Sequence, residues 1–261
     1  MPRIRSIYRY PIKGLSPEPL ARAVLSPGAT IPGDRLYAIE NGPSGFDPAK
    51  PYLPKTRFLM LMKNERLASL RTTFDQETHE LTIETPTLPS AASGGRFWET
   101  RVTADLRSAE GRTRIENFFA QFCADELRGP PKILSAPGHS FSDVARKVVS
   151  IINLASVAAV EAMAGAPVNP LRFRGNLYVE GWPAWRELDL VGEALTIGGA
   201  RLNVVKRIVR CAATNVDPDT GARDLNIPQS LMRHLGHADC GIYAEVIAGG
   251  EIVVGDEIEI G

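Results

Sequence analysis

Residues 209–221 read Val209-Arg210-Cys211-Ala212-Ala213-Thr214-Asn215-Val216-Asp217-Pro218-Asp219-Thr220-Gly221. A β-rich run from Ala200 to Val209 leads into the cysteine, and the residues after it are typical of a turn. Proline fixes φ, aspartate hydrogen-bonds nearby backbone groups and glycine readily adopts positive φ, so residues 217–221 predict a tight loop. Cysteine binds metal or attacks as the thiolate, which a neighbouring cation such as Arg210 stabilises. The stretch therefore predicts a reactive cysteine held where a strand meets a loop.

The composition is ordinary for a soluble globular protein. The chain has 261 residues, of which 44% are hydrophobic and 23% charged, and 30 Lys and Arg balance 30 Asp and Glu. This length allows one large or two modest domains. A net charge of zero gives no electrostatic case for nucleic-acid binding. No stretch approaches the ~18 apolar residues of a membrane span, so we expect a cytoplasmic protein without one.

Cysteine usage favours a reducing compartment. Cys123, Cys211 and Cys240 form no Cys-x-x-Cys pair, so a disulfide framework is not indicated. Cys123 shares a predicted helical face with Ile115 and Phe119, which predicts a core position because free cysteine is often buried. Cys240 could approach Cys211 and exchange sulfur with it.

One set of metal ligands is a competing signal. His234-x-x-His237-x-x-Cys240 offers three ligands that zinc accepts. Spacing of three and six residues turns the third ligand away from the first on a helix, and Gly236 interrupts that helix. No fourth ligand is visible, so loop histidines beside a strand are the better interpretation.

The first half of the chain predicts sheet and loop with one helix. Short β-type runs predict strands at Arg3–Tyr8 and Leu36–Glu40, and alternation of apolar and polar residues predicts a hairpin of Arg66–Thr73 with Glu80–Thr85. Turn residues predict loops at 41–55 and 86–95. Large apolar side chains at helical spacing predict an amphipathic helix at Arg112–Leu127. Loops as long as 41–55 often cover sites. Gly129-Pro130-Pro131 ends the helix and is the best candidate for a join between two regions.

The second half predicts a small barrel with helices. Val148–Ile152 has the apolar run of a buried strand, and a helix follows at Asn153–Ala164 with Asn153 or Ser156 as its N-cap. From Leu188 onward, short β segments alternate with glycine turns, which is typical of a closed or partly closed barrel. The fold class is therefore mainly β with α (α+β).

Several cations follow turn residues or alternate with an aromatic residue. On a strand, Arg172 and Arg174 would project from one face and Phe173 from the other. Two guanidiniums on one face suit a phosphate, which arginine binds with two donors. A solvated strand face is the alternative for this pair. Solvated surface charge is also the simpler interpretation of Lys13 and Arg35 from residue chemistry alone.

These motifs resemble the MOSC domain family, named for the C-terminal domain of molybdenum-cofactor sulfurases. The nearest relatives look like its stand-alone oxidoreductases, which include the mitochondrial amidoxime-reducing component and bacterial counterparts. Besides Arg210-Cys211 and residues 216–221, the resemblance rests on Tyr10-Pro11-Ile12-Lys13-Gly14, Gly33-Asp34-Arg35, Arg172-Phe173-Arg174-Gly175-Asn176-Leu177, Gly241-Ile242-Tyr243-Ala244-Glu245-Val246 and Val254-Gly255-Asp256. It implies an N-terminal MOSC-associated β-rich domain at 1–128 and a MOSC domain, a β-barrel with flanking helices, at 129–261.

The resemblance also implies a cofactor and the residues that hold it. The cofactor is the molybdenum cofactor (Mo-molybdopterin), with Cys211 as the metal ligand and catalytic centre. The residues implied to hold its pterin and phosphate are Lys13, Arg35, Arg174, Asn176 and Arg210. Arg172 is a further cofactor-binding candidate from the Arg-Phe-Arg pattern, at a position where these relatives tend to carry Asn. Ser156, at the predicted strand–helix junction, is a further candidate contact, with a capping or surface role as the alternative.

The implied reaction is reduction of a small N-hydroxylated substrate. No cysteine cluster could hold an iron–sulfur centre, so we expect a separate electron donor of the ferredoxin, flavodoxin or cytochrome b5 type. Two alternatives stay open: a sulfur carrier with a persulfide on Cys211, and a protein that binds and delivers the finished cofactor. Pyridoxal phosphate binding is linked to this chain only through the wider superfamily. In fused sulfurases a pyridoxal-phosphate desulfurase region precedes the MOSC domain, and nothing in this chain resembles that region.

Overall fold

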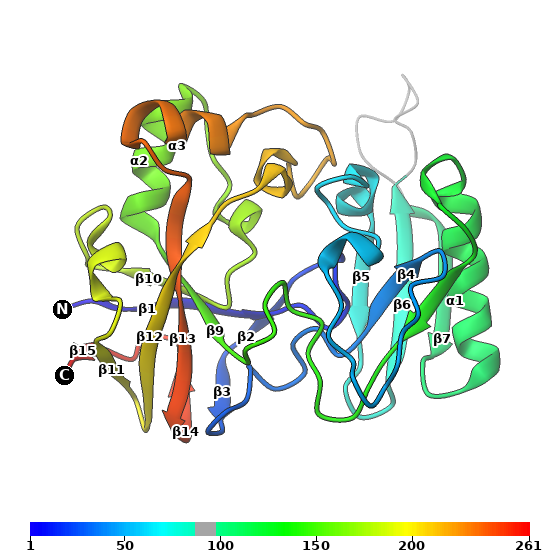
Figure 1. Cartoon of the computed structure of the whole chain (residues 1–261), viewed down its shortest axis with the longest axis horizontal. Helices are drawn as coiled ribbons and strands as arrows, with labels where there is room; N and C mark the ends of the chain where they lie inside the picture. Colours follow the sequence, from blue (N-terminus) through cyan, green and yellow to red (C-terminus); the bar gives the residue numbers. More distant parts are fainter. Residues whose placement is uncertain (87–97) are drawn as a thin grey trace.

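A computed structural model of the chain describes residues 1–86 and 98–261. The predicted loop at 86–95 lies, after Pro86, outside these residues. Figure 1 shows two lobes: one holds a large sheet with two helices, α2 and α3, and the other holds β4–β7 with helix α1. The two lobes together form an α+β fold, as the sequence predicts.

The large sheet has eight strands and curls into a half-barrel. Its order is β15-β11-β12-β13-β9-β10-β1-β2, and β9 and β10 are parallel while their neighbours pair antiparallel. Its strands are β1 (Arg3–Arg9), β2 (Glu18–Leu20), β9 (Val149–Asn153), β10 (Leu177–Glu180), β11 (Ala194–Ile197), β12 (Ala200–Val209), β13 (Asp239–Ala248) and β15 (Ile258–Ile260).

The start of the chain belongs to this sheet. β1 lies between β10 and β2, with Ile4 opposite Val179 and Ile7 opposite Leu177. β3 (Arg22–Leu25) pairs with β14 (Gly250–Val253), which is a second link between the first and last segments. The predicted division into two domains at 128/129 stays a prediction. The pairs β1 with β10 and β3 with β14 each join a strand before this position to one after it.

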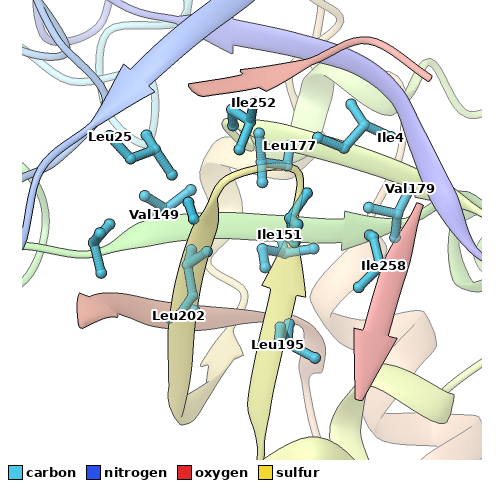
Figure 2. Close-up of a cluster of buried hydrophobic side chains, with 14 of the residues drawn as sticks. Ile4, Leu25, Val149, Ile151, Leu177, Val179, Leu195, Leu202, Ile252 and Ile258 are labelled. Carbon is cyan, nitrogen blue, oxygen red and sulfur yellow. The ribbon is translucent and has the colours of Figure 1, made fainter. Parts of the chain in front are cut away.

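The core of the half-barrel is aliphatic. Figure 2 shows side chains from strands far apart in the sequence, including Ile4, Ile151, Leu177 and Leu202, directed into one cluster. These four side chains are at most 1% exposed. β-Branched and aliphatic residues on a pleated surface pack well, so this cluster closes the curled sheet around itself.

The second lobe holds two small sheets, and helix α1 packs against a strand of each. Its described elements are β4 (Ala38–Asn41), β5 (Arg71–Phe74), β6 (Glu80–Pro86), β7 (Trp98–Asp105), α1 (Ala109–Phe122) and β8 (Pro131–Leu134), with 3-10 turns at Lys55–Arg57, Glu65–Ser69 and Ala124–Glu126. β5, β6 and β7 pair antiparallel, and β8 pairs with β4. The predicted hairpin is confirmed at β5 and β6, but its first residues form the 3-10 turn at Glu65–Ser69.

Helix α1 confirms the predicted amphipathic helix with shifted ends. It begins at Ala109 because the Ser108 hydroxyl accepts the Gly111 N–H and caps the first turn. Ile115 and Phe119 are fully buried against the lobe's core. The helix ends at Phe122, five residues before the predicted end, and residues 124–126 tighten into a 3-10 turn.

Two helices cover one side of the half-barrel. α2 (Leu154–Ala164) follows β9 directly, and the Asn153 side chain accepts the Ala155 N–H, so Asn153 is the N-cap. Gly165 ends α2 in the left-handed conformation, where a residue without Cβ is favoured. α3 (Ile227–Leu235) packs beside α2. In the described residues no helix is long and apolar enough to cross a membrane.

The N-terminal strand should be essential to the stability of the half-barrel. Ile4→Ala is expected to lower the free energy of unfolding by about 2–4 kcal/mol, because it leaves a cavity in a fully buried cluster. Urea unfolding followed by circular dichroism measures this change. Val24→Ala, at a side chain 59% exposed on β3, is the control and should change stability by less than about 0.5 kcal/mol. Equal, small effects of both substitutions would contradict the packing described.

Candidate active-site cleft

A cleft of about 360 Å³ lies where the two lobes meet. This volume is within the usual range for a site that binds a small molecule or cofactor. Its charged lining is strongly basic: eight Lys and Arg residues face two aspartates. These residues are Lys13, Arg35, Lys55, Arg172, Arg174, Lys206, Arg207 and Arg210, with Asp34 and Asp143.

Cys211 lies in the wall of this cleft, at the end of β12. It is half-buried and is not in a disulfide. Its carbonyl accepts hydrogen bonds from the Thr214 N–H and hydroxyl, which begins the short turn Ala212–Asn215. The predicted strand-to-loop position of the cysteine is therefore observed.

The end of β12 departs from regular alternation. Its ladder to β13 is irregular between Val204 and Lys206 and again between Arg207 and Val209. A regular strand sends alternate side chains to opposite faces, whereas such irregularities redirect them. As a result all six residues from 206 to 211 line the cleft.

Lys55 is the cation that contacts the Cys211 thiol. Its Nζ is 3.4 Å from Cys211 Sγ and 3.1 Å from a carboxylate oxygen of Asp143. Lys13 donates to the other oxygen of Asp143 at 2.5 Å and to the Phe141 carbonyl at 2.8 Å. Asp143 thus joins a lysine from the start of the chain to the lysine beside the thiol. Lys13 is among the site residues predicted from the sequence, whereas Lys55 and Asp143 are not.

Arg210 does not take the role expected from its place next to the cysteine. Its Nε donates to the Cys240 carbonyl at 2.6 Å, and Nη1 donates to the Phe173 carbonyl at 2.9 Å. Its Nη2 is buried and has no partner among the described residues, although Arg210 lines the cleft. An anion in the cleft could accept this free N–H.

Arg172 and Arg174 are not on a strand, contrary to the sequence-based expectation. Pro170–Phe173 form a 3-10 turn, which the Asn169 side chain caps by accepting the Leu171 N–H. Proline at the first position of such a turn has the required φ, so the local sequence favours helix over strand. Arg174 follows with φ of 50°, in the left-handed region.

The two arginines consequently have different surroundings. Arg172 donates to the carboxylates of Asp217 and Asp224 and to the Asn215 carbonyl, so it anchors the loop that follows Cys211. Its charge is already matched by two carboxylates. Arg174 is partly buried and makes no ion pair among the described residues. Each arginine keeps one buried N–H without a partner there, Nε in Arg172 and Nη2 in Arg174. Arg174 is therefore the better placed of the two to bind an anion.

Asn176 and Ser156 are both tied to neighbouring protein groups. The Asn176 side-chain oxygen accepts the N–H and hydroxyl of Ser150, and its nitrogen donates to the Tyr8 carbonyl, which links β9, β10 and β1. Asn176 lines the cleft, but Ser156 does not. Ser156 is fully buried and donates to Glu187, so the structure does not bring it to the cleft. The first turn of α2 directs this hydroxyl toward the protein interior.

Arg223 holds the loop after Cys211 against the other lobe. It donates to the Ala212 carbonyl at 3.1 Å, and its other terminal nitrogen donates to the carbonyls of Leu61 and Met62 and to Glu65. One side chain thus connects the residue next to the thiol with the apolar cleft wall of the second lobe. The sequence analysis had no signal for this residue, because the contact spans about 160 residues.

The other cysteines lie in cores. Cys123 is 1% exposed, as predicted, and burial raises its pKa to about 12. Cys240 is fully buried, burial likewise raises its pKa to about 12, and it is not part of the cleft lining. In the described part of the chain, no three His, Cys, Asp or Glu side chains are grouped closely enough to hold a metal. His234, His237 and Cys240 therefore form no such group.

These observations fit an anionic ligand that brings metal ligands of its own. The cleft supplies one accessible thiol, an excess of cations and the unpartnered N–H groups of Arg174 and Arg210. Buried donors without partners are rare in folded proteins, and an oxyanion would satisfy them. The molybdenum cofactor matches this requirement, since its pterin dithiolene adds sulfur ligands and its phosphate adds negative charge.

The geometry defines a class: a two-lobed α+β protein with a basic cleft around one cysteine. Two family models match the chain, the MOSC N-terminal beta barrel domain at residues 1–128 and the MOSC domain at 136–259. The chain belongs to the MOSC family, which is linked to molybdenum-cofactor-binding proteins. The resemblance inferred from the motifs is confirmed.

Comparisons with curated proteins and solved structures add no relative on which a function could be based. No curated protein sequence matches the chain. The crystal structure of YuaD from Bacillus subtilis is 14% identical, with a TM-score of 0.46 over 100% of this chain and 96% of its own. That of YiiM from Geobacillus stearothermophilus is 18% identical, with a TM-score of 0.35 over 43% of this chain and 53% of its own. Neither score supports a conclusion about fold or function.

Asp143→Asn should reduce the acid sensitivity of folding. Partial desolvation acts to raise the pKa of Asp143, whose side chain is 44% exposed, but the charges of Lys13 and Lys55 outweigh this effect and lower the pKa well below its usual range. The carboxylate therefore stabilises the fold above its unfolded pKa of about 3.9, and this contribution is lost as pH falls below that value. Urea unfolding from about pH 6 to pH 2.5 should show a shallower decline for the variant than for wild type.

Asp189→Asn is the control for this experiment, because Asp189 is exposed and its ion pairs with described residues are long, at 3.9 Å. It should keep the wild-type decline. Identical pH profiles for wild type and both variants would contradict the charge arrangement around Asp143.

Proposed function

We propose that this chain binds the molybdenum cofactor, with Cys211 as the protein ligand of the metal, and reduces small N-hydroxylated substrates. One observation carries the proposal: the accessible thiol lies in a basic cleft that contains buried, unpartnered guanidinium N–H groups. Membership of the MOSC family supports the choice of cofactor.

The chain's own residues would have separate roles in binding. Arg174 and Arg210 offer free donors to the anionic parts of the cofactor, and Arg35 adds a charge beside Arg174. Lys55 would donate to the sulfur of Cys211, since its Nζ lies 3.4 Å from Sγ, and so hold the side chain in the cleft wall. Arg172 and Arg223 would act indirectly by fixing the loop that follows Cys211.

The reaction would break the N–O bond of the substrate. Two electrons and two protons convert an N-hydroxyl group into an N–H group and water. The cofactor, when bound, supplies the two-electron redox chemistry, and the protein supplies orientation and charge. The apolar cleft residues Met60, Leu61 and Met62 would exclude water from one side of the substrate.

Metal content tests the proposed ligand. The chain should contain near-stoichiometric molybdenum when it is produced in a host that makes the cofactor, and Cys211→Ser should lose most of it, because the thiolate is the only ligand from the protein. Elemental analysis measures both. Cys123→Ala, at a buried thiol in the other lobe, is the matched control and should retain the metal. Equal molybdenum in wild type and Cys211→Ser would contradict the assignment.

Turnover should require a second protein. The purified, loaded chain is expected to reduce an N-hydroxylated substrate only when a reduced ferredoxin, flavodoxin or cytochrome b5 type donor is added, because no described cluster of cysteines could hold an electron-transfer centre. Spectroscopic assay of donor oxidation measures the rate. Turnover with NADH alone would overturn this part of the proposal.

The Lys55 contact also favours a second function, in which Cys211 carries a persulfide. A cation beside a half-buried thiol would equally assist its attack on a sulfur donor. Mass spectrometry of the freshly purified chain separates the two functions: a carrier gains the mass of one sulfur on Cys211 and contains no molybdenum. A delivery protein would instead contain molybdenum, release it readily to an apo-enzyme and show no reductase activity with any donor.

A further inference from the structure

Tyr10 is a buried aromatic residue in contact with two cleft arginines. Its side chain is fully buried, and its ring centroid is 4.9 Å from the Arg35 guanidinium carbon and 4.2 Å from that of Arg174. Both distances are within the range of cation–π attraction. Tyr10 does not itself line the cleft, whereas Arg35 and Arg174 do.

Hydrogen bonds of Tyr10 tie it to the segments that carry both arginines. Its N–H donates to Asp34 at 2.8 Å, and its carbonyl accepts the Arg35 N–H at 2.7 Å. Its hydroxyl donates to the Gly175 carbonyl at 3.2 Å, directly after Arg174. Arg35 and Arg174 both have φ near 50°, a left-handed conformation that is uncommon for arginine. The ring is therefore held by the same two segments whose guanidiniums it contacts.

The positive charges of Arg35 and Arg174 are only partly balanced by neighbouring protein groups. Asp34 pairs with Arg35, and Arg35 also donates to the Arg174 carbonyl at 3.2 Å. Burial raises the pKa of Tyr10, so the phenol stays neutral and cancels neither guanidinium. Arg174 keeps an unpartnered, buried N–H. Both guanidiniums contact the same ring, so their like charges repel each other, and an oxyanion in the cleft that contacts both would relieve the repulsion.

We propose that Tyr10 is a positioning residue that presents Arg35 and Arg174 together to an oxyanion in the cleft. Its ring attracts both guanidiniums from a buried position, which keeps them aligned before the anion arrives. The chemical class of the anion is a phosphate or phosphate ester. That the natural anion is part of the molybdenum cofactor rests on the proposed function, but the positioning role does not.

Inorganic phosphate is the probe, and its dissociation constant for the full chain is measured by calorimetric titration. Arg35→Ala and Arg174→Ala should each weaken phosphate binding. That result would show that both guanidiniums contact the phosphate. Tyr10→Phe keeps the ring and should bind phosphate nearly as wild type does. Tyr10→Leu removes the ring and should weaken binding about tenfold, the effect expected from losing a partly desolvated pair of cation–π contacts.

Phenylalanine with one, two or three fluorine atoms at position 10 keeps the shape of the ring, and so tests the role even if Tyr10→Leu does not fold. Fluorine withdraws electron density from the ring face, so phosphate affinity should fall stepwise with each atom. The same series at Phe119, a fully buried ring in the other lobe, is the control and should leave the affinity unchanged.

Three results would overturn the positioning role: no phosphate binding by the wild type, binding that is indifferent to Arg35 and Arg174, or affinity that is flat across the fluorinated series. Failure of the proposed function is distinguishable, because it would show as absent molybdenum in a wild-type chain that still binds phosphate through Tyr10.

Discussion

The position of β1 between β10 and β2 is the constraint on which the cleft depends. Its pairing places Ile4 and Ile7 in the core of the half-barrel, and the chain leaves the strand at Tyr10 directly toward the arginines of the 172–176 segment. Lys13 then reaches Asp143, which lies in the segment between β8 of the second lobe and β9 of the half-barrel. Because these contacts depend on one strand pairing, the N-terminal segment shapes the site as much as the segment that carries the cysteine.

The cations in and beside the cleft fall into two groups. Some have carboxylate partners and act structurally: Arg172 in the cleft wall with two carboxylates, and Arg223 beside the cleft with Glu65 and three carbonyls. Arg174 and Arg210 have no carboxylate partner among the described residues, and each keeps a buried N–H without a partner there. The first group holds the loop after Cys211 in place, and the second is free to bind an anion. Sequence motifs contain both groups without distinguishing them, since each guanidinium's partners are set by the fold.

The elements that the sequence predicted well are those whose evidence is local. The helix at Ala109–Phe122 follows from the spacing of Ile115 and Phe119, and the strand at Val149–Asn153 from one apolar run. The Arg-Phe-Arg alternation misled, because capping by Asn169 and the φ of Pro170 outweigh it. Lys55 could not be found from the sequence, since it lies 156 residues from the thiol that it contacts. The outline of the site could therefore be predicted from the sequence, whereas the pairing within it could not.

The most consequential proposal is that the sulfur of Cys211 binds molybdenum, in a chain whose described residues form no group of three His, Cys, Asp or Glu side chains that could hold a metal. Selenocysteine at position 211 makes this atom directly observable by X-ray absorption at the selenium edge. In protein produced by a host that makes the cofactor, the account predicts a molybdenum neighbour of the selenium, because selenium would replace sulfur as the ligand. A selenium bound only to carbon, or to carbon and one sulfur, would contradict the claim, and the latter result would identify a sulfur carrier.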